Sequence, residues 1–294
     1  MSSQLVGMRG EIILIMRTIL ESHEAGELQA ATVQGSFVMK CGGSTLAALP
    51  DSFFHDLREL QESGVHPVIV HGGGPAISDN LAKLGIDSEF VHGLRKTTED
   101  VLDVVEMVLS GSINKQIVRR IQNVGGRAWG LSGVDGSLIQ AKPVANSAEV
   151  GFVGEVTHVE ASIIQGVQDM GYIPVIAPIG IDLSGQRYNI NADTAAGAVA
   201  SHLGVSRMIV VTDVPGIMKT VNGEKVVLSS VTVQEIDDMI ETGEIYGGMI
   251  PKVRAAMSCI HGDVQEVVIV DGSEPKVLSR VMQGEIIGTR IARG

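Results

Sequence analysis

Short apolar runs that end in glycine-rich turns recur along this chain, and most are followed by a segment with helical spacing. Residues 68–70 and 208–211 are apolar at consecutive positions, which is typical of strands that are buried on both faces. Strands that alternate with helices in this way form an open, mostly parallel sheet with helices on both sides. We therefore expect an α/β fold, a three-layer αβα sandwich with a mostly parallel central sheet.

The same patterns predict the bounds of the elements. The expected strands are 37–40, 67–71, 127–131, 173–177, 207–212 and 266–270. The expected helices are 51–63, 76–84, 97–124, 160–170, 192–202, 233–241 and 251–260. Residues 137–159 and 179–190 carry short alternating pieces separated by Gly, Asn and Pro, which predicts antiparallel hairpin flaps over the sheet.

The N-terminal segment differs from the rest of the chain. Apolar residues between Ile12 and Leu20 recur at helical spacing, and residues 27–35 have the composition of a linker. Residues 1–35 are therefore predicted to be an extension made of an amphipathic helix and a linker. Residues 36–294 form the main domain, and a soft boundary near 178–185 divides it into the lobes 36–180 and 181–294.

Composition argues against several classes of protein. A net charge of −12 gives no basic footprint for nucleic acid, and two cysteines are typical of a reduced, cytoplasmic protein. The longest clean apolar run near the N-terminus has five residues, which is too short for a membrane span or a secretory signal. An acidic protein that binds anions needs a local positive focus. The candidates for this focus are Lys40, Arg95, Lys96 and Lys252.

Two glycine loops follow the first two strands. Lys40 precedes glycines at 42–43, and His71 precedes glycines at 72–74. Glycines between a strand and a helix expose backbone N–H groups that can hold phosphate or carboxylate oxygens. Cys41 is expected to serve as a small turn residue, because no neighbouring base is placed to activate its thiol. His71 is expected to be a buried strand-end residue and not a catalytic base.

Further polar residues stand at later helix starts and strand ends. Arg95 precedes a long helix and can hold a carboxylate in a bidentate fork. Asn189 and Asp193 can lie on one side of a helix start, and Asp213 ends a buried strand where nucleotides bind in parallel sheets. Lys252 follows another glycine loop. The chain has no Gly-Lys dipeptide, which excludes a P-loop, and no Gly-x-Gly-x-x-Gly fingerprint after a strand.

These segments form an ordered set of motifs. The set is Lys-x-Gly-Gly, His-Gly-Gly-Gly-Pro, Gly-x-Arg-Lys-Thr, Asn-x-Asn-Ala-Asp, Thr-Asp-Val-x-Gly-Ile and Gly-Gly-Met-Ile-Pro-Lys-Val. From about Gly35 to Arg293 the chain resembles the acetylglutamate kinases of the amino-acid kinase family. The resemblance implies ATP-dependent phosphorylation of the side-chain carboxylate of N-acetyl-L-glutamate, a step of arginine biosynthesis. Lobe 36–180 would bind acetylglutamate and form a dimer, and lobe 181–294 would bind ATP.

The resemblance also implies roles for single residues. Its catalytic residues are Lys40, Lys252 and Asp193, with Asp193 organising the two lysines. Its acetylglutamate-binding residues are Gly72, Gly73, Arg95 and Asn189, with Arg95 on the α-carboxylate. Its ATP-binding residues are Gly42, Gly43, Asp213, Val214, Pro215, Gly216, Ile217, Met218, Glu244, Ile245 and Tyr246. ATP would be the co-substrate with Mg²⁺ carried by its phosphates, so no protein ligand to a metal is expected.

The sequence leaves alternatives open for the oligomeric state and for the acceptor substrate. A homodimer is expected, and a hexamer through residues 1–35 is the alternative, as in arginine-inhibited members; the sequence does not decide arginine inhibition. A sibling kinase with an aminoadipate-type acceptor is the nearest rival function. A non-catalytic amino-acid sensor on the same fold is the other, although it would have no need of two transfer lysines. A dinucleotide-dependent dehydrogenase is disfavoured by the missing fingerprint.

Overall fold

The structure is a computed structural model that describes residues 35–221, 224–247, 249–260 and 264–293. The chain divides between Val33 and Gln34, and every described residue belongs to the unit that begins at Gln34. The N-terminal helix and most of the linker predicted over residues 1–35 therefore lie outside the described residues, as does any contact of the alternative hexamer through them.

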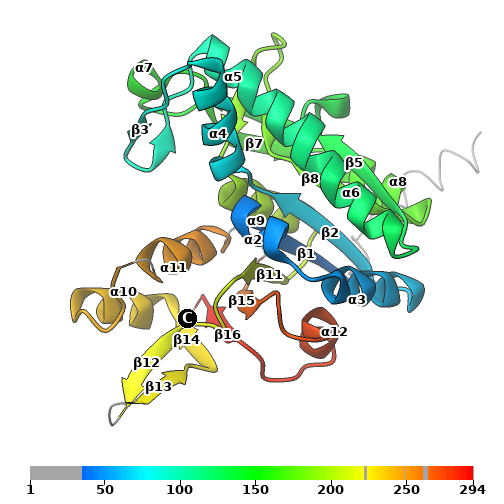
Figure 1. Ribbon diagram of the computed structural model, residues 1–294, viewed down its shortest axis with the longest axis vertical. Helices are drawn as coiled ribbons and strands as arrows, with labels where there is room; N and C mark the ends of the chain where they lie inside the picture. Colours follow the sequence, from blue (N-terminus) through cyan, green and yellow to red (C-terminus); the bar gives the residue numbers. More distant parts are fainter. Residues whose placement is uncertain (1–34, 222–223, 248, 261–263, 294) are drawn as a thin grey trace, which may run out of the picture. The chain divides into compact units, whose positions relative to one another are not determined.

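An eight-stranded sheet forms the centre of the domain, in the order β14–β16–β15–β11–β1–β2–β8–β5 (Figure 1). Its strands are β1 (Ser36–Cys41), β2 (His66–His71), β5 (Ala128–Ser132), β8 (Ile173–Ala177), β11 (Arg207–Thr212), β14 (Ser230–Thr232), β15 (Glu266–Asp271) and β16 (Thr289–Ala292). All neighbours from β15 to β5 are parallel, whereas β16 is antiparallel to β15 and pairs in parallel with β14. The mostly parallel sheet predicted from the sequence is confirmed.

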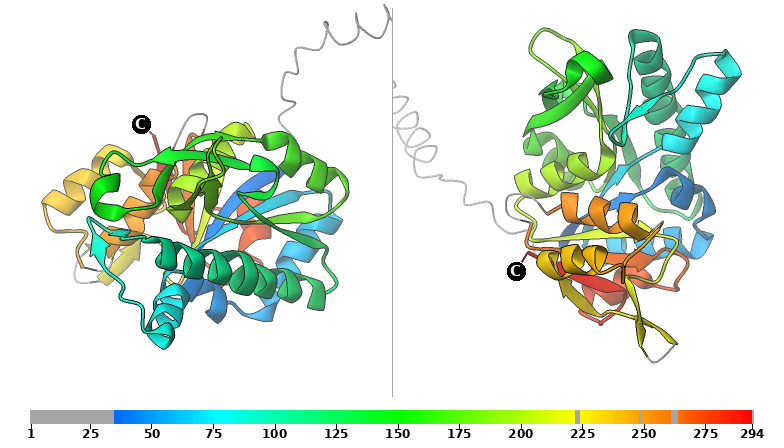
Figure 2. Two further views of the ribbon diagram at one scale, coloured as in Figure 1. Left: turned by 90° about the horizontal axis from the view of Figure 1, so that it is seen from above. Right: turned by 90° about the vertical axis from the view of Figure 1, so that its left-hand side faces the viewer.

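Helices cover both faces of this sheet (Figure 2). They are α2 (Gly43–Ala48), α3 (Asp51–Glu62), α4 (Gly74–Leu84), α5 (Glu99–Glu106), the π-helix η1 (Met107–Ile113), α6 (Asn114–Asn123), the 3₁₀ turn η2 (Asp135–Ser137), α7 (Ser147–Val150), α8 (Ala161–Asp169), α9 (Ala192–His202), α10 (Val233–Glu241), α11 (Met249–Ser258) and α12 (Val277–Met282). Side chains alternate along β1, so Phe37 and Met39 join the core with α3, α6 and α12. Val38 joins the opposite core with α8, α9 and α11. The fold is the expected three-layer αβα sandwich.

Four strands outside the central sheet form the predicted flaps. They are β6 (Ile139–Pro143), β7 (Val153–Val159), β9 (Ile179–Ile181) and β10 (Arg187–Ile190). The pairs β6–β7 and β9–β10 are antiparallel, and the parallel pairs β7–β10 and β6–β9 close the four strands into a ring. Within this ring Asn189 is the register partner of Val153. Two short hairpins, β3 (Phe90–Val91) with β4 (Leu94–Arg95) and β12 (Met218–Val221) with β13 (Glu224–Val227), lie apart from it.

The expected strands correspond to β1, β2, β5, β8, β11 and β15, which are the parallel strands of the sheet. The sequence analysis missed the edge strand β14, its neighbour β16 and the helix α12. The helix expected over residues 97–124 is continuous, but its middle turn is the π-helix η1. Among the helices of the described residues, none is long and apolar enough to cross a membrane.

Candidate active site

Two glycine loops meet at the carboxyl ends of the neighbouring strands β1 and β2. The N–H of Gly72 donates to the carbonyl of Cys41, with an N···O distance of 3.0 Å. A Cβ added at Gly43 would lie 2.7 Å from the Cα of Gly73, so a side chain there would collide with backbone. The close approach of the two loops therefore requires glycine. Each loop leads into a helix, α2 or α4, whose first N–H groups have no acceptor within the helix.

His71 is fully buried below these loops. Its Nδ1 lies 3.2 Å from the carbonyl oxygen of Gly72, and the Nδ2 of Asn114 lies 3.3 Å from its Nε2. A ring that donates through Nδ1 and accepts at Nε2 is neutral. Burial lowers the pKa of His71 to about 4, in agreement with the neutral form. The expectation of a buried strand-end histidine is confirmed.

Lys40 and Asp193 form an ion pair in which Nζ lies 2.7 Å from Oδ1, and each side chain is only 14% exposed. Lys40 lies on β1, whereas Asp193 lies in the first turn of α9. Asn191 caps this helix, because its Oδ1 accepts hydrogen bonds from the N–H groups of Asp193 and Thr194 at 2.8 and 3.1 Å. The cap fixes the helix start, and the positive end of the helix dipole favours the Asp193 carboxylate.

A cavity of about 330 Å³ opens above the glycine loops and the Lys40–Asp193 pair. It is lined by Lys40, Gly42, Gly43, Gly72, Gly73, Gly74, Pro75, Ile77, Phe90, Gly93, Leu94, Arg95, Leu109, Val153, Pro178, Asn189, Ile190, Asn191, Ala192 and Asp193. The fold thus places cationic, amide and glycine residues from β1, β2, β4, β10 and α9 around one space, which we call the acceptor cavity.

Arg95 enters the acceptor cavity from the hairpin β3–β4. Its Nη2 donates to the carbonyl of Gly74 at 3.0 Å and to the hydroxyl of Ser78 at 2.9 Å, and its Nη1 donates to Ser88. The guanidinium carbon lies 4.6 Å from the ring centre of Phe90. These bonds use three of the five N–H donors of a guanidinium. Burial lowers the pKa of Arg95, but an arginine remains charged near neutral pH.

Asn189 is oriented by a buried threonine. The Nδ2 of Asn189 donates to the hydroxyl of Thr97 at 3.1 Å, and that hydroxyl donates to the carbonyl of Arg95 at 2.8 Å. The backbone of Thr97 is held in turn by Val150 and Phe152, with N···O distances of 2.7 and 2.8 Å. With Nδ2 engaged, Asn189 presents its Oδ1 as an acceptor for an N–H group of a ligand.

Lys252 and Asp213 form a second ion pair at the carboxyl end of β11. Lys252 Nζ lies 2.5 Å from Asp213 Oδ1, and the side chains are 34% and 70% exposed. The hydrogen bond from Lys252 lowers the pKa of Asp213. Lys40 lies near the end of β1, and Asp213 directly follows β11, the parallel neighbour of β1, so the two ion pairs lie at the same carboxyl edge of the sheet. The predicted role of Asp193 toward both lysines is seen here for Lys40 alone, since Lys252 pairs with Asp213.

The turn after β11 is held in place by Thr289 on β16, a residue with no assigned role in the sequence analysis. The hydroxyl of Thr289 accepts from the N–H of Ile217 at 2.8 Å and donates to the carbonyl of Leu228 at 2.6 Å. Gly216 has a φ of +144°, and a Cβ there would lie 2.5 Å from this hydroxyl. The turn therefore requires glycine, as its place in the predicted nucleotide loop suggested.

A smaller cavity of about 150 Å³ lies beside the hairpin β12–β13. It is lined by Met218, Lys225, Glu244, Ile245, Tyr246 and Met249. The structure thus brings together Met218 and the segment 244–246, which the sequence analysis assigned to ATP. The carboxylate of Glu244 pairs with Lys219 at 2.8 Å, and Tyr246 is largely exposed.

Comparison with known proteins places the chain in a family. Residues 36–271 match the model of the amino acid kinase family. The chain belongs to the amino acid kinase family. It is 51% identical over 235 residues to the acetylglutamate kinase of Geobacillus kaustophilus (strain HTA426), which covers 80% of this chain and 89% of that protein.

Two further proteins are similar to this chain. The acetylglutamate kinase of Halalkalibacterium halodurans (strain C-125) is 47% identical over 256 residues, covering 87% of this chain and 95% of that protein. Among solved structures, smu.665 from Streptococcus mutans UA159 is similar, with a TM-score of 0.75 and 29% identity. That similarity covers 89% of this chain and all of the other.

Two side chains considered in the sequence analysis, Cys41 and Lys96, are not placed to take part in chemistry at the site of this member of the amino acid kinase family. Burial raises the pKa of the Cys41 thiol to about 12, which leaves it protonated and inert as a nucleophile. Lys96, expected to add local positive charge, instead pairs with Glu89 at 2.9 Å on the surface, with 45% of its side chain exposed. Within the described residues, no group of three or more His, Cys, Asp and Glu is arranged to hold a metal ion.

The sequence analysis missed residues that act by supporting others. Thr97 orients Asn189, Asn114 fixes the ring of His71, and Thr289 holds the turn after β11. None carries a local sequence signal, because the partner of each lies more than forty positions away. Asn191 was visible as the second asparagine of Asn-x-Asn-Ala-Asp, and its place before a helical run predicts an N-cap.

Proposed function

We propose that the protein transfers the γ-phosphoryl group of ATP to the side-chain carboxylate of N-acetyl-L-glutamate, as a step of arginine biosynthesis. The supporting observation is that Arg95 and Lys40 line one cavity. Two separate cations suit a ligand with two carboxylates. The curated relatives described above carry the name acetylglutamate kinase.

The acceptor is placed by three kinds of contact. Arg95 binds the α-carboxylate with the N–H donors that its protein partners leave available. Asn189 accepts the acetamido N–H through its Oδ1, because Thr97 engages its other end. The side-chain carboxylate then extends toward the loops of Gly72 and Gly73, whose backbone comes close to Lys40. This orientation presents one carboxylate, and not the other, to the phosphoryl donor.

The transfer needs positioning and charge stabilisation more than proton transfer. A glutamate carboxylate with a pKa near 4.3 is already ionised at pH 7, so no general base is required. Its oxygen bonds to the γ-phosphorus while the bond to the β,γ-bridging oxygen breaks, giving acetylglutamyl phosphate and ADP. Lys40, held by Asp193, and Lys252 stabilise the charge on the migrating group from two sides.

The nucleotide is assigned to the carboxyl end of β11. The loop that begins at Asp213 and the segment 244–246 surround its base and ribose, and the loop at 42–43 approaches its phosphates. Mg²⁺ is proposed to enter with ATP, carried by the nucleotide phosphates. Bound there, it would supply neutralisation of phosphate charge.

An ADP-release assay tests this function. We expect turnover that requires both ATP and N-acetyl-L-glutamate, and a lower kcat/KM for the acceptor with one more methylene, by about tenfold or more. A preference for the aminoadipate homologue would assign the protein to the sibling kinases. Binding of both ligands by calorimetry without any ADP release would favour the sensor.

The protein is further proposed to be a homodimer through lobe 36–180. β5 is an edge strand of the sheet, and Trp129 on this strand is 44% exposed. Met170 and Met107 of the same lobe are exposed as well, at 50% and 59%. Such a surface on an unpaired strand favours pairing with another chain. Light scattering should give twice the chain mass, and a monomer at micromolar concentration would contradict the dimer.

A further inference from the structure

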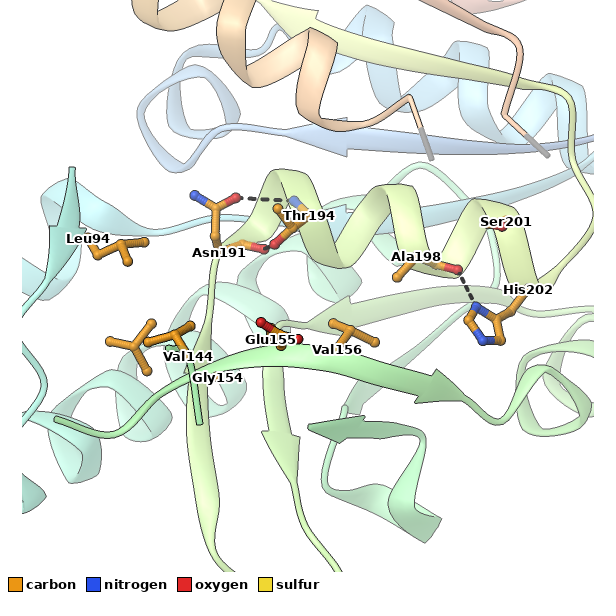
Figure 3. A pocket seen from close by; sticks show the side chains of 11 residues that line it. Leu94, Val144, Gly154, Glu155, Val156, Asn191, Thr194, Ala198, Ser201 and His202 are labelled. Carbon is orange, nitrogen blue, oxygen red and sulfur yellow. Dashed lines mark hydrogen bonds between the residues drawn. The ribbon is translucent and has the colours of Figure 1, made fainter. Parts of the chain in front are cut away.

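A second cavity lies beside the acceptor cavity, between α9 and β7 (Figure 3). Its volume is about 510 Å³, and we call it the side cavity. It is lined by Leu94, Val144, Val153, Gly154, Glu155, Val156, Asn191, Thr194, Ala198, Ser201 and His202. Leu94, Val153 and Asn191 line the acceptor cavity as well. The two cavities therefore adjoin at these three residues.

The shared boundary lies where the acyl group of the acceptor is expected. Val153 is the register partner of Asn189, the residue assigned to the acetamido N–H. Leu94 precedes Arg95 on the same short strand, and successive side chains of a strand point to opposite faces. Arg95 turns toward α4, where it binds Gly74 and Ser78, so Leu94 faces the other way. An acyl chain on the amide nitrogen would leave the acceptor cavity past these two apolar side chains.

The side cavity is suited to an apolar chain. Its apolar lining is formed by Leu94, Val144, Val153, Val156 and Ala198, and Ala198 lies toward the end near His202, away from the shared boundary (Figure 3). Its polar groups already have partners within the protein. Thr194 Oγ1 donates to the carbonyl of Asn191 at 3.0 Å, His202 Nδ1 lies 2.9 Å from the carbonyl of Ala198, and Glu155 pairs with Lys142 at 2.8 Å. An alkyl chain can therefore enter without breaking hydrogen bonds that a ligand would have to replace.

We propose that the enzyme also accepts N-acyl-L-glutamates with straight acyl chains longer than acetyl, and that the side cavity holds the additional methylenes. This rests on the proposed function, because it uses the same orientation of the acceptor. The reaction is unchanged, since only the group on the amide nitrogen differs. Because of the side cavity, the enzyme discriminates only weakly between substrates whose acyl chains differ in length.

Kinetics with N-acetyl-, N-propionyl- and N-butyrylglutamate test the proposal. We expect kcat/KM for the butyryl compound to stay within about tenfold of the acetyl compound. An enclosed acetyl pocket would instead lose about tenfold or more for each added methylene. A loss above tenfold for N-butyrylglutamate, with normal turnover of N-acetylglutamate, would overturn this proposal alone. Failure to phosphorylate any of the three would overturn the proposed function together with it.

Substitutions that fill the side cavity away from the shared boundary provide the second test. Ala198→Phe is expected to lower kcat/KM for N-butyrylglutamate by at least about tenfold and to leave N-acetylglutamate unchanged. Glu155→Trp should act in the same way and is safer for folding, because Glu155 is exposed. Glu155→Gln is the matched control, since it removes the charge and keeps the space. Equal effects on both substrates, or none on either, would overturn the route through the side cavity.

Discussion

The acceptor side and the nucleotide side of this site hold their charges in different ways. On the acceptor side, Lys40 and Asp193 are each 14% exposed, and Arg95 is buried among hydrogen-bond partners. On the nucleotide side, Lys252 and Asp213 are 34% and 70% exposed. Exposed ion pairs contribute little to stability, whereas a buried pair is costly to break. The charges of the proposed acceptor side are therefore held by the fold itself, whereas those of the proposed nucleotide side remain largely exposed.

The largest expected effect is on the nucleotide side. Lys252→Ala should lower kcat by about 10²–10³-fold and leave the KM for acetylglutamate nearly unchanged, because the lysine acts on the charge of the transition state. Lys40→Ala with Lys252→Ala should be strongly non-additive, since both act on one phosphoryl group. Lys276→Ala, which removes an exposed lysine paired with Glu59, is the control. Unchanged turnover in Lys252→Ala would contradict the assignment.

The two ion pairs themselves provide the next comparison. Asp193→Asn should lower the free energy of unfolding by about 3 kcal/mol, because it leaves Lys40 buried without its carboxylate. Asp213→Asn should change it by less than about 1 kcal/mol, because its pair is exposed. Urea unfolding of both variants measures the difference. An equal loss of unfolding free energy in the two variants would show that the difference in exposure between the two ion pairs does not affect stability.

Arg95 should act mainly on acceptor binding. Arg95→Ala is expected to raise the KM for acetylglutamate by about 100-fold, because a buried guanidinium that holds a carboxylate is lost. The kcat at saturating acceptor should fall much less, and the KM for ATP should not change. Arg127→Ala is a suitable control, since Arg127 stacks on Tyr172 at 4.3 Å away from the acceptor cavity. A rise in the KM for ATP alone would contradict this role.

Acid should destabilise the acceptor side through His71, whose pKa burial lowers to about 4. Below pH 6.5 the unfolded chain gains a proton that the folded chain does not, so stability falls as the pH drops from 6.5 toward 4. The slope from this residue approaches about 1.4 kcal/mol per pH unit. His71→Gln should flatten the slope in urea titrations between pH 7 and 5, and exposed His55→Gln should not. An unchanged slope in His71→Gln would refute the buried neutral state.

The smallest effect concerns the orientation of Asn189. Thr97→Val keeps the shape of the side chain and removes the hydroxyl. The loss of its hydrogen bond to Asn189 should weaken acceptor binding by about 1 kcal/mol, which raises the KM for acetylglutamate roughly fivefold. Thr98→Val is the matched control at the next position. Thr98 caps α5 through a bond of 3.4 Å to Val101, so its loss should reduce stability and leave KM unchanged. The same KM in Thr97→Val and the wild type would rule out the positioning role.

The sequence predicts the central parallel strands of the sheet well, and the short strands β14 and β16 and the helix α12 poorly. Strands such as β2 and β11 are buried on both faces, and consecutive apolar residues make them visible. β14 and β16 have three and four residues, which is too short for a pattern. α12 follows Lys276, which has a φ of +52° and gives no side-chain cap, so its start has no sequence signal.

The same division applies to the site. Gly43, Gly73 and Gly216 were visible because backbone approach demands glycine, and such positions follow strand ends. The partner of Lys252 was not visible, since pairing with Asp213 depends on how α11 packs against α9 and β15. Lys96 shows the reverse error. It neighbours Arg95 in sequence, but it lies just after β4, where its N–H donates to the carbonyl of Glu89 and its ammonium pairs with the carboxylate of the same residue.

The Lys40–Asp193 pair joins segments on opposite sides of the proposed lobe boundary, because Lys40 lies on β1 and Asp193 on α9. In a chimeric enzyme whose junction lies between Lys40 and Asp193, the two residues of this ion pair would come from different homologues. Packing of α9 against β1 would therefore have to be inherited as a unit, by placing the crossover after His202. With α9 kept on the N-terminal segment, the proposed acceptor-binding and nucleotide-binding segments could then be exchanged separately between homologues.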